Sequence, residues 1–191
     1  MAAEAQGHIG MALRLATSTD ARARRKETLV AALQIDSIPK AMSTAERWLE
    51  LAKKDADALT LERDGEERAN LLATLGIPEG GTIPPALRAD IKALEEAQKR
   101  RSTRSLRDGI DRILVDLMSL YRDIMTLQLA ANADLVNADL RNQLEEVATS
   151  STPAQTIAKL EAMSQARVRI SSNVRDLMVL EALAISLRRK I

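Results

Sequence analysis

Few side chains in this sequence have the type and spacing that covalent or acid–base chemistry needs. His8 is the only histidine and there is no cysteine, so neither a zinc site nor a cysteine nucleophile can be assembled. The carboxylate pairs Glu95–Glu96 and Glu145–Glu146 lie in charged segments, where adjacent acids are usually solvated. Gly80-Gly81 lacks the lysine and hydroxyl of a phosphate-binding loop. We therefore expect no catalytic residue, metal, cofactor or small-molecule substrate, and we interpret His8 as a surface residue.

Two clusters of basic residues have the charge needed to contact phosphate groups. The first comprises Arg22, Arg24, Arg25 and Lys26, and the second comprises Lys99, Arg100, Arg101, Arg104 and Arg107. The net charge is only +1, from 28 basic and 27 acidic residues, so a global basic field is absent. No aromatic residues interleave with either cluster, which argues against base stacking. We expect DNA contact to be at most indirect, with Lys99, Arg100, Arg101 and Arg104 as weak candidates beside the alternative of a solvated helix face.

The composition predicts an all-α protein. Hydrophobic residues make up 46% of the 191 positions, but there is no Phe, one Trp and one Tyr. Ala, Leu, Arg and Glu favour helices, whereas the aromatic and β-branched residues that favour strands are scarce. No apolar run is long enough for a membrane span, and residues 1–10 do not resemble an export signal. We expect a cytoplasmic protein without membrane contact, and the opening residues suggest a segment of a longer protein.

The clearest pattern in the sequence is a two-faced helix over residues 108–130. Its apolar positions follow helical spacing and are Ile110, Ile113, Leu114, Leu117, Tyr121, Ile124 and Leu127. Its polar positions are Asp111, Arg112, Asp116, Arg122 and Asp123. A helix of this length spans roughly 34 Å and must bury its apolar stripe against helices of its own chain or of a partner. The pattern indicates a protein built for assembly rather than catalysis, and core packing is the favoured role for Trp48 and Tyr121.

Further helices are expected on both sides of a break at residues 76–85, which hold three Gly and three Pro. Before it, we predict helices at 8–16, 21–33 with Asp20 as N-cap, around Trp48 with Ser37 or Ser43 as N-cap, and at 66–75. After it, a helix begins near Pro84 and either continues past Gly109 or is weakened there. Further helices are expected at 139–149, from Thr152-Pro153 and after Asn173 as N-cap.

The last of these helices has its own apolar stripe. Its members are Val174, Leu177, Met178, Leu180, Leu183, Ala184 and Leu187. We expect the stripes of 108–130 and 173–190 to face each other in a helical bundle.

Three segments, in this order, carry a family resemblance. A G-x-x-x-x-A-L motif is formed by Gly7, Ala12 and Leu13. An L-x-x-x-Y-R-D motif is formed by Leu117, Tyr121, Arg122 and Asp123. A third segment is marked by Asn173, Leu180, Glu181, Leu183 and Leu187. Together they resemble the C-terminal part of the delta-prime subunits of bacterial DNA polymerase III clamp loaders, in their actinobacterial form.

The resemblance implies a division of the chain into three parts. Residues 1–35 would be the end of the AAA+ lid helices, 36–83 a helical insert with a Gly/Pro-rich linker, and 84–191 the helical collar domain. The insert, from Met42 to Gly81, is the part least matched to the family. At the position where motor subunits carry a sensor arginine this chain has Gly10, which fits the family's delta-prime subunit, a stator without ATPase function.

The resemblance also implies a function. This chain would be a non-catalytic structural module of the polymerase holoenzyme, joining the collar ring that holds together the pentamer that loads the sliding clamp during DNA replication. Its partners would be the delta and gamma/tau subunits. The alternatives are the collar of a gamma/tau motor subunit and a helical adaptor outside replication. Candidate collar packing or interface residues are Leu117, Tyr121, Arg122, Asp123, Asn173, Leu180, Glu181, Leu183 and Leu187; for Arg122 and Asp123, an interface contact and a solvated pair both remain open.

Overall fold

The fold is an all-α helical bundle, as the composition predicts. The computed structural model describes residues 9–78, 81 and 83–189, and over this part of the chain it has no strand. These described residues are 83% helical. It forms two compact units: unit 1 combines the residues up to Leu51 with those from Asp111 onward, and unit 2 is Ala52–Ile110. The unit boundaries fall inside long helices, whereas the expected division into lid, insert and collar has boundaries after residues 35 and 83; that division stays a prediction.

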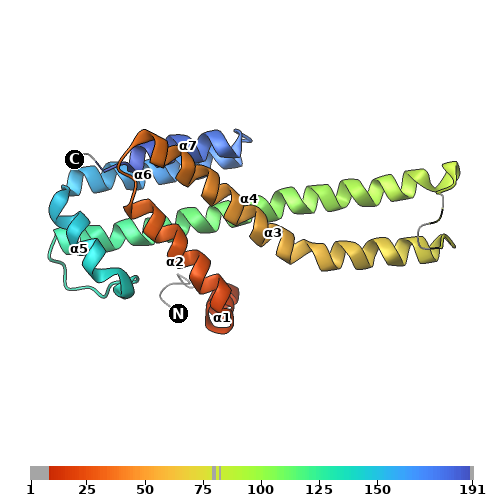
Figure 1. Ribbon diagram of the computed structural model, residues 1–191, viewed down its shortest axis with the longest axis horizontal. Coiled ribbons are helices and arrows are strands. Elements are labelled where there is room, and N and C mark those ends of the chain that lie inside the picture. Colours follow the sequence, from red (N-terminus) through yellow and green to blue (C-terminus); the bar gives the residue numbers. More distant parts are fainter. Residues whose placement is uncertain (1–8, 79–80, 82, 190–191) are drawn as a thin grey trace. The chain divides into compact units, whose positions relative to one another are not determined.

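Seven α-helices occur within the described residues (Figure 1). They are α1 (Ile9–Thr17), α2 (Thr19–Leu33), α3 (Ile38–Thr74), α4 (Arg88–Gln128), α5 (Arg141–Ser150), α6 (Pro153–Ser171) and α7 (Asp176–Leu187), with short 3-10 helices at Pro85–Leu87 and Ala138–Leu140. The N-terminus of α6 follows the expected cap-then-proline pattern. Thr152 and Gln155 form a reciprocal capping box there, so two backbone N–H groups that the helix leaves unpaired are satisfied.

Two expected N-caps differ from those in the structure. The Ser18 side chain caps α2 by accepting a 3.1 Å hydrogen bond from the Ala21 N–H, so Asp20 lies in the first turn instead of at the cap. Helix α3 begins directly after Ser37, with Pro39 in its first turn, which agrees with the first of the two alternatives. Ser43 lies inside α3 and donates to the Lys40 carbonyl over 3.1 Å, so the capping box proposed for it is wrong.

Helix α3 is longer than the sequence suggests, whereas α4 agrees with the unbroken alternative. The separate helix expected at 66–75 is the last part of α3, which continues through Gly65. Gly76 ends α3 with a φ of +68°, and the Ile77 N–H bonds back to the Leu72 carbonyl over 2.9 Å. Helix α4 also continues without a break at Gly109. A Cβ at Gly109 would lie 3.3 Å from the Ala52 carbonyl oxygen, so this glycine permits close approach of α3 and α4 within unit 2.

Asn173 ends a helix rather than starting one. Its φ of 61° places it in the left-handed region, which asparagine tolerates better than most residues. The following N–H, of Val174, bonds to the Arg169 carbonyl over 3.1 Å, as in a typical C-terminal cap of α6. The residue preceding α7 is Arg175. The expected N-cap role of Asn173 for the last helix is therefore wrong.

The core of unit 1 is made of large aliphatic residues and the two aromatic residues. Trp48 and Tyr121 are buried, which agrees with the core role favoured for both. Helix α6 runs antiparallel to α4, because Arg167 pairs with Asp111 at 2.6 Å while Lys159, two turns earlier in α6, lies over the Tyr121 ring. Buried apolar residues of this core include Leu29, Leu114, Leu117, Leu120, Ile124, Leu144, Met163, Leu180, Leu183 and Leu187.

A buried polar network holds the segment that follows α4. Asp123 is 0% exposed and accepts hydrogen bonds from the backbone N–H groups of Val136 (3.1 Å) and Asn137 (2.7 Å). The Asn137 side chain donates to Asp123 over 2.9 Å and accepts from Arg25 over 2.7 Å. Arg25 in turn pairs with Asp116 at 2.8 Å, which ties α2 to α4. The sequence places Asp123 on the polar face of this helix, and it is buried there because these donors replace water.

Unit 2 is a hairpin of α3 and α4 connected through charged side chains. Arg101 bonds to Asp64 at 2.6 Å and to Glu67 at 2.9 Å, and Arg68 pairs with Glu95 at 2.7 Å. Small residues, Ala52, Ala56 and Gly109, occupy buried positions near the start of this hairpin. Its large buried side chains are few: within the described part of unit 2 they are Ile77, Ile91 and Ile110. None of the described helices is both long and apolar enough to cross a membrane.

Candidate assembly surface

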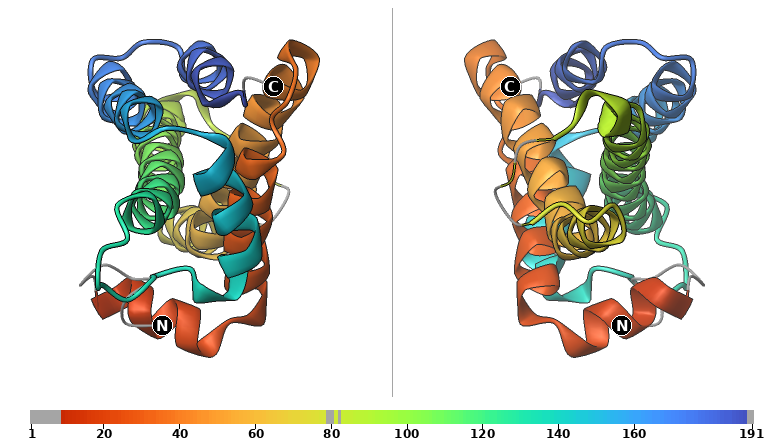
Figure 2. Two further views of the ribbon diagram at one scale, coloured as in Figure 1. Left: turned by 90° about the vertical axis from the view of Figure 1, so that its left-hand side faces the viewer. Right: turned by 90° about the vertical axis from the view of Figure 1, so that its right-hand side faces the viewer.

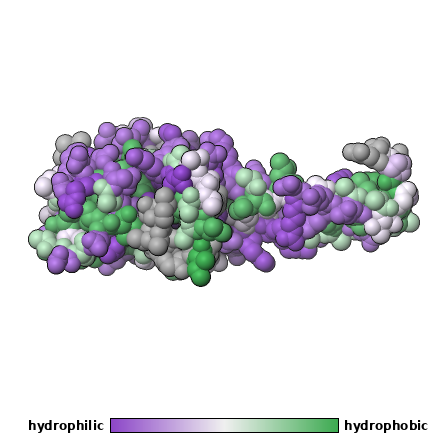
Figure 3. Space-filling model, turned by 90° about the horizontal axis from the view of Figure 1, so that it is seen from below, coloured by the Kyte–Doolittle hydropathy of each residue, from purple (hydrophilic) through white to green (hydrophobic). Residues whose placement is uncertain are grey.

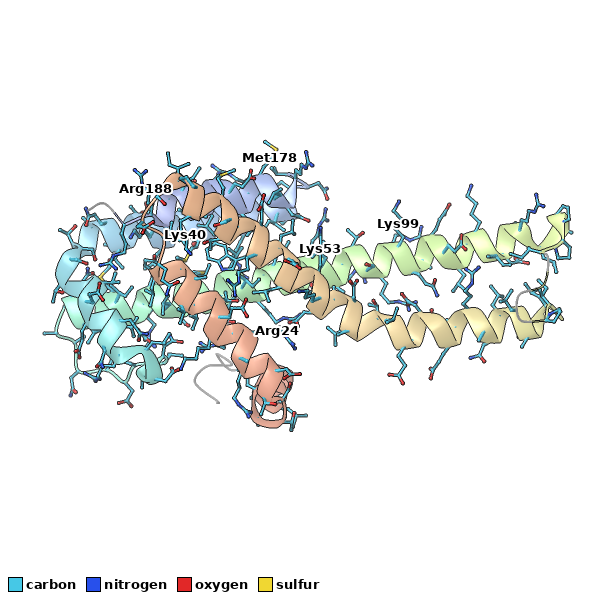
Figure 4. The ribbon with its side chains drawn as sticks, in the orientation of Figure 1. Arg24, Lys40, Lys53, Lys99, Met178 and Arg188 are labelled. Carbon is cyan, nitrogen blue, oxygen red and sulfur yellow. The ribbon has the colours of Figure 1, made fainter. Side chains whose placement is uncertain are left out.

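Helix α7 is apolar on two opposite faces. Val179, Leu180, Leu183, Ala184 and Leu187 are buried in unit 1. Met178 and Ile185 are 58% and 43% exposed, and their seven-residue spacing is two turns, so they lie on one line. Met178 and Leu180 are two residues apart, which is roughly 200° around the helix, and Met178 points away from the bundle in Figure 4. Glu181, three residues after Met178 and four before Ile185, lies on the same line, so this outward face of α7 combines two apolar side chains with one carboxylate.

Helix α6, which packs beside α7, repeats this arrangement (Figure 1). Met163, Ala166 and Ile170 are buried in unit 1. Ile157 and Val168 are 49% and 63% exposed, and they are eleven residues apart, which is three turns of one face. Together, the outward residues Ile157, Val168, Met178 and Ile185 form what we call the α6–α7 outer face. It is a set of large apolar side chains that unit 1 does not cover, with the exposed Glu161 and Ser164 between Ile157 and Val168 and with Glu181 between Met178 and Ile185.

Helix α1 has a second open apolar face. Leu15 is buried, whereas Ile9 and Leu13, one turn apart, are exposed. Helical spacing places Ile9, Ala12, Leu13 and Ala16 on one face, and in the structure Ile9, Leu13 and Ala16 are exposed while Ala12 is half-buried. Within unit 1, α1 lies on the opposite side from α6 and α7 (Figure 2). Apolar side chains gather over α1 in the space-filling view from its side (Figure 3).

Most of the expected interface residues lie in the core of unit 1. Leu117, Tyr121, Leu180, Leu183 and Leu187 are all buried, and burial raises the pKa of the Tyr121 hydroxyl above its usual value. They are positions for packing within the chain and present no surface to a neighbour.

The polar members of this set are divided between several environments. Arg122 is exposed, Glu181 is half-buried, Asp123 belongs to the buried network, and Asn173 ends α6. Arg122 lies 3.7 Å from the Asp123 carboxylate, which is enclosed by donors, so the two do not form a solvated pair; an interface contact by the exposed Arg122 stays a prediction.

The lid motif lies only in part within the described residues. Gly7, like His8, lies outside them, and Gly10 is in α1. Ala12 is half-buried and Leu13 is 65% exposed. Of this motif, Leu13 therefore contributes to an open surface.

The second basic cluster is divided between a structural and a solvent-facing part. Arg101 is engaged by Asp64 and Glu67 across the hairpin, and the hydrogen bonds with Glu67 raise the pKa of its guanidinium. Lys99, Arg100 and Arg104 are exposed on α4, and Lys99 points away from α3 in Figure 4. Arg101 is thus removed from the weak DNA-contact candidates. Of the first cluster, Arg22 bonds to the last carbonyls of α1 and Arg25 to Asp116.

The sequence analysis did not recognise the open faces of α6 and α7. Met178 was placed in the inward stripe of the last helix, and Ile157 and Val168 were not singled out. The available signal was the near absence of polar residues from 176–187, where only Asp176, Glu181 and Ser186 are polar. No group of three or more His, Cys, Asp or Glu side chains within the described residues could hold a metal ion.

Comparisons with protein-family models, with curated proteins and with solved structures found no match. The functional argument therefore depends on the residues and geometry of this chain.

Proposed function

We propose that this chain is a structural assembly module of a bacterial clamp loader, the C-terminal part of a delta-prime subunit. In this role it joins the collar ring that holds together the cytoplasmic pentamer that loads the sliding clamp during DNA replication. The observation that carries the proposal is the α6–α7 outer face, on which Ile157, Val168, Met178 and Ile185 remain uncovered by unit 1. The family resemblance supplies the identity of the neighbours.

The outer face has the chemistry of a subunit contact. Aliphatic and methionine side chains release water when a second apolar helix packs on them, at about 25 cal/mol per Å² of apolar area. Two helices side by side present ridges and a groove into which a partner helix can pack. A standard interface buries about 1,600 Å² in total, so the neighbour must also contact residues around these four.

The open face of α1 fits the same proposal. If α1 is the end of a lid, Ile9 and Leu13 pack against the remainder of the lid module. The outer face of α6–α7 is then left for the neighbouring collar domains. α1 and α6–α7 lie on opposite sides of unit 1, so the contact with the lid and the contact with a neighbouring collar do not compete for one surface (Figure 2).

The proposal can be tested by light scattering on a size-exclusion column. The chain is run alone and then mixed with the collar domains of delta and gamma/tau subunits from the same organism. We expect a defined mixed complex that persists in moderate salt, because apolar contacts are weakly screened. The double variant Met178→Glu/Ile185→Glu should prevent the complex, since it places two charges on the outer face.

A matched control is the double variant Leu59→Glu/Leu61→Glu, which changes two exposed apolar residues of α3 in unit 2. It should assemble like the unmodified chain. If the chain stays separate from every collar domain while circular dichroism shows it folded, the clamp-loader proposal is wrong. The helical adaptor outside replication then becomes the better hypothesis. Assembly that is unchanged by the α7 double variant would show that the contact lies elsewhere.

A further inference from the structure

A pocket of about 400 Å³ opens in unit 1 where the ends of α5 and α7 meet α6. Val147, Ala158 and Ala162 give it an apolar lining, and Lys159, Arg188 and Arg189 give it three positive charges. Binding sites for small molecules typically measure about 300–1,000 Å³ and combine apolar walls with a few polar groups. The pocket has this size and this combination.

Lys159 has no counter-ion in the described part of the chain. Its ammonium group lies 5.4 Å from the centre of the Tyr121 ring, which provides a cation–π contact but no negative charge. Burial and the nearby Arg189 both lower the pKa of Lys159. Holding a half-buried ammonium beside another cation costs free energy unless an anion compensates it. A negatively charged group bound beside Lys159 would therefore stabilise its ammonium group.

The two arginines at the end of α7 add to this positive charge. Arg189 is fixed in place, because its N–H donates to the Ile35 carbonyl over 2.8 Å and its guanidinium bonds to Glu146 at 2.9 Å. The Arg188 guanidinium has no partner among residues 9–78, 81 and 83–189; its backbone position is visible in Figure 4. The pocket thus has three cationic side chains and one neighbouring carboxylate, that of Glu146, so its net charge is positive.

The remaining polar groups of the pocket are three serine hydroxyls and one amide. The hydroxyls of Ser150, Ser151 and Ser186 donate to carbonyls of their own helices. Gln155 uses its side-chain oxygen in the capping box of α6, which leaves its NH₂ group to donate. With their protons engaged, these hydroxyls can offer a ligand only acceptor oxygens, so the donors available to an anion are the Gln155 NH₂ group and the two cations Lys159 and Arg188.

We propose that this pocket binds a carboxylate on a short apolar tail, held by Lys159 and Arg188 with the tail against Ala158 and Ala162. The carboxylate can belong to a free short-chain acid or to a glutamate side chain of another protein. A guanidinium matches the geometry of a carboxylate, and the small alanines leave room for methylene groups. This inference goes beyond the proposed function and does not depend on it.

The test is a titration of the full chain with butyrate and, separately, with a blocked Ala-Glu-Ala tripeptide, at constant ionic strength set with chloride. Binding is followed by isothermal calorimetry and by NMR of ¹³C-labelled lysine side chains. We expect saturable binding by at least one of the two probes and a rise in the pKa of Lys159 when the probe is bound. Lys159→Met and Arg188→Gln should each weaken binding about tenfold or more, as expected for a lost charge-assisted hydrogen bond.

Lys99→Met is the matched control, because Lys99 is an exposed lysine of unit 2; it should bind like the unmodified chain. Binding of butyrate alone would assign the pocket to a small acid, and binding of the tripeptide alone would assign it to a protein side chain. The proposal is overturned if neither probe binds saturably, or if binding is unchanged in folded Lys159→Met and Arg188→Gln. Both results are independent of whether the chain joins other clamp-loader subunits.

Discussion

Units 1 and 2 share the helices α3 and α4, but their stabilising contacts differ in kind. In unit 1, large side chains such as Trp48 and Leu117 are fully buried, and even its charged Asp123 is enclosed. In unit 2 the two helices meet through small residues and through partly exposed ion pairs centred on Arg101. Core burial contributes several kcal/mol per large side chain, whereas exposed ion pairs contribute little. Two parts of one continuous helix can therefore be stabilised by different kinds of contact.

The largest effect is expected from a core truncation in unit 1. Leu117→Ala should lower the free energy of unfolding by about 3 kcal/mol, because Leu117 is 0% exposed and its removal leaves a cavity. Leu61→Ala, a matched change at a 75% exposed leucine of unit 2, should change it by less than about 0.5 kcal/mol. Urea unfolding followed by circular dichroism measures both. Similar losses for the two variants would remove the contrast between the units.

The next effect concerns the buried polar network. Asp123→Asn should lower the free energy of unfolding by about 2 kcal/mol. The reason is that a neutral amide accepts hydrogen bonds from the backbone N–H groups of Val136 and Asn137 less strongly than a carboxylate does. The control is Arg122→Gln at the exposed neighbouring position, which should be nearly neutral. Amide hydrogen exchange should show faster exchange at Val136 and Asn137 in the Asp123 variant. Unchanged exchange at both would contradict the network as described.

Alanine substitutions at two glycines of unit 2 are expected to change stability in opposite directions. Both effects should be smaller than those of the two preceding variants. Gly65→Ala should stabilise α3 by up to about 1 kcal/mol, since a Cβ there meets nothing within 4 Å and alanine favours helix. Gly109→Ala should destabilise the hairpin, because the added Cβ would lie 3.3 Å from a backbone oxygen, where a tight contact cannot relax easily. Hydrogen exchange of the α3 and α4 amides measures both. Stabilisation by both variants would show that α3 and α4 separate readily.

The smallest effect is expected at the ion pairs of unit 2. Hydrogen bonds from Arg101 and Arg63 lower the pKa of Glu67 below its ordinary value of 4.5. Its contribution to stability is therefore complete above pH 4.5 and is lost as the pH falls through the folded-state pKa. Arg101→Gln should reduce this pH dependence and part of the salt sensitivity, with Arg63 retaining the remainder, whereas Arg100→Gln should not. Thermal unfolding recorded between about pH 3 and about pH 7 measures this effect. An unchanged acid profile in Arg101→Gln would show that Glu67 is held by other groups.

The sequence predicts the helices well where one helix face meets one core. The stripe of residues 108–130 contains Leu114, Leu117, Tyr121 and Ile124, all of which are buried. The start of α6 was also predicted, because the Thr152-Pro153 signal is local. The burial of Asp123 was not, since its donors come from a loop thirteen and fourteen residues later, which periodicity does not place.

The candidate surface was harder to predict for a related reason. Periodicity identifies that a helix has apolar residues but not which of two apolar faces enters the core. On α7 large apolar residues occur on both faces, and on α1 the apolar Ile9 and Leu13 are exposed whereas Leu15 is buried. The pocket around Lys159 is equally non-local, because α5, α6 and α7 each contribute residues to it. Such sites depend on how helices pack, which local patterns do not specify.

The burial of Trp48 gives the protein an intrinsic optical reporter. It is the only tryptophan in the sequence, its indole is 0% exposed, and its N–H lies 3.4 Å from the Thr28 carbonyl oxygen. Tryptophan emission moves to longer wavelength when the ring enters water, so fluorescence follows the melting of unit 1. Unit 2 contains neither tryptophan nor tyrosine and does not contribute. A spectrum and a circular dichroism trace recorded together would therefore separate the two units without any added label.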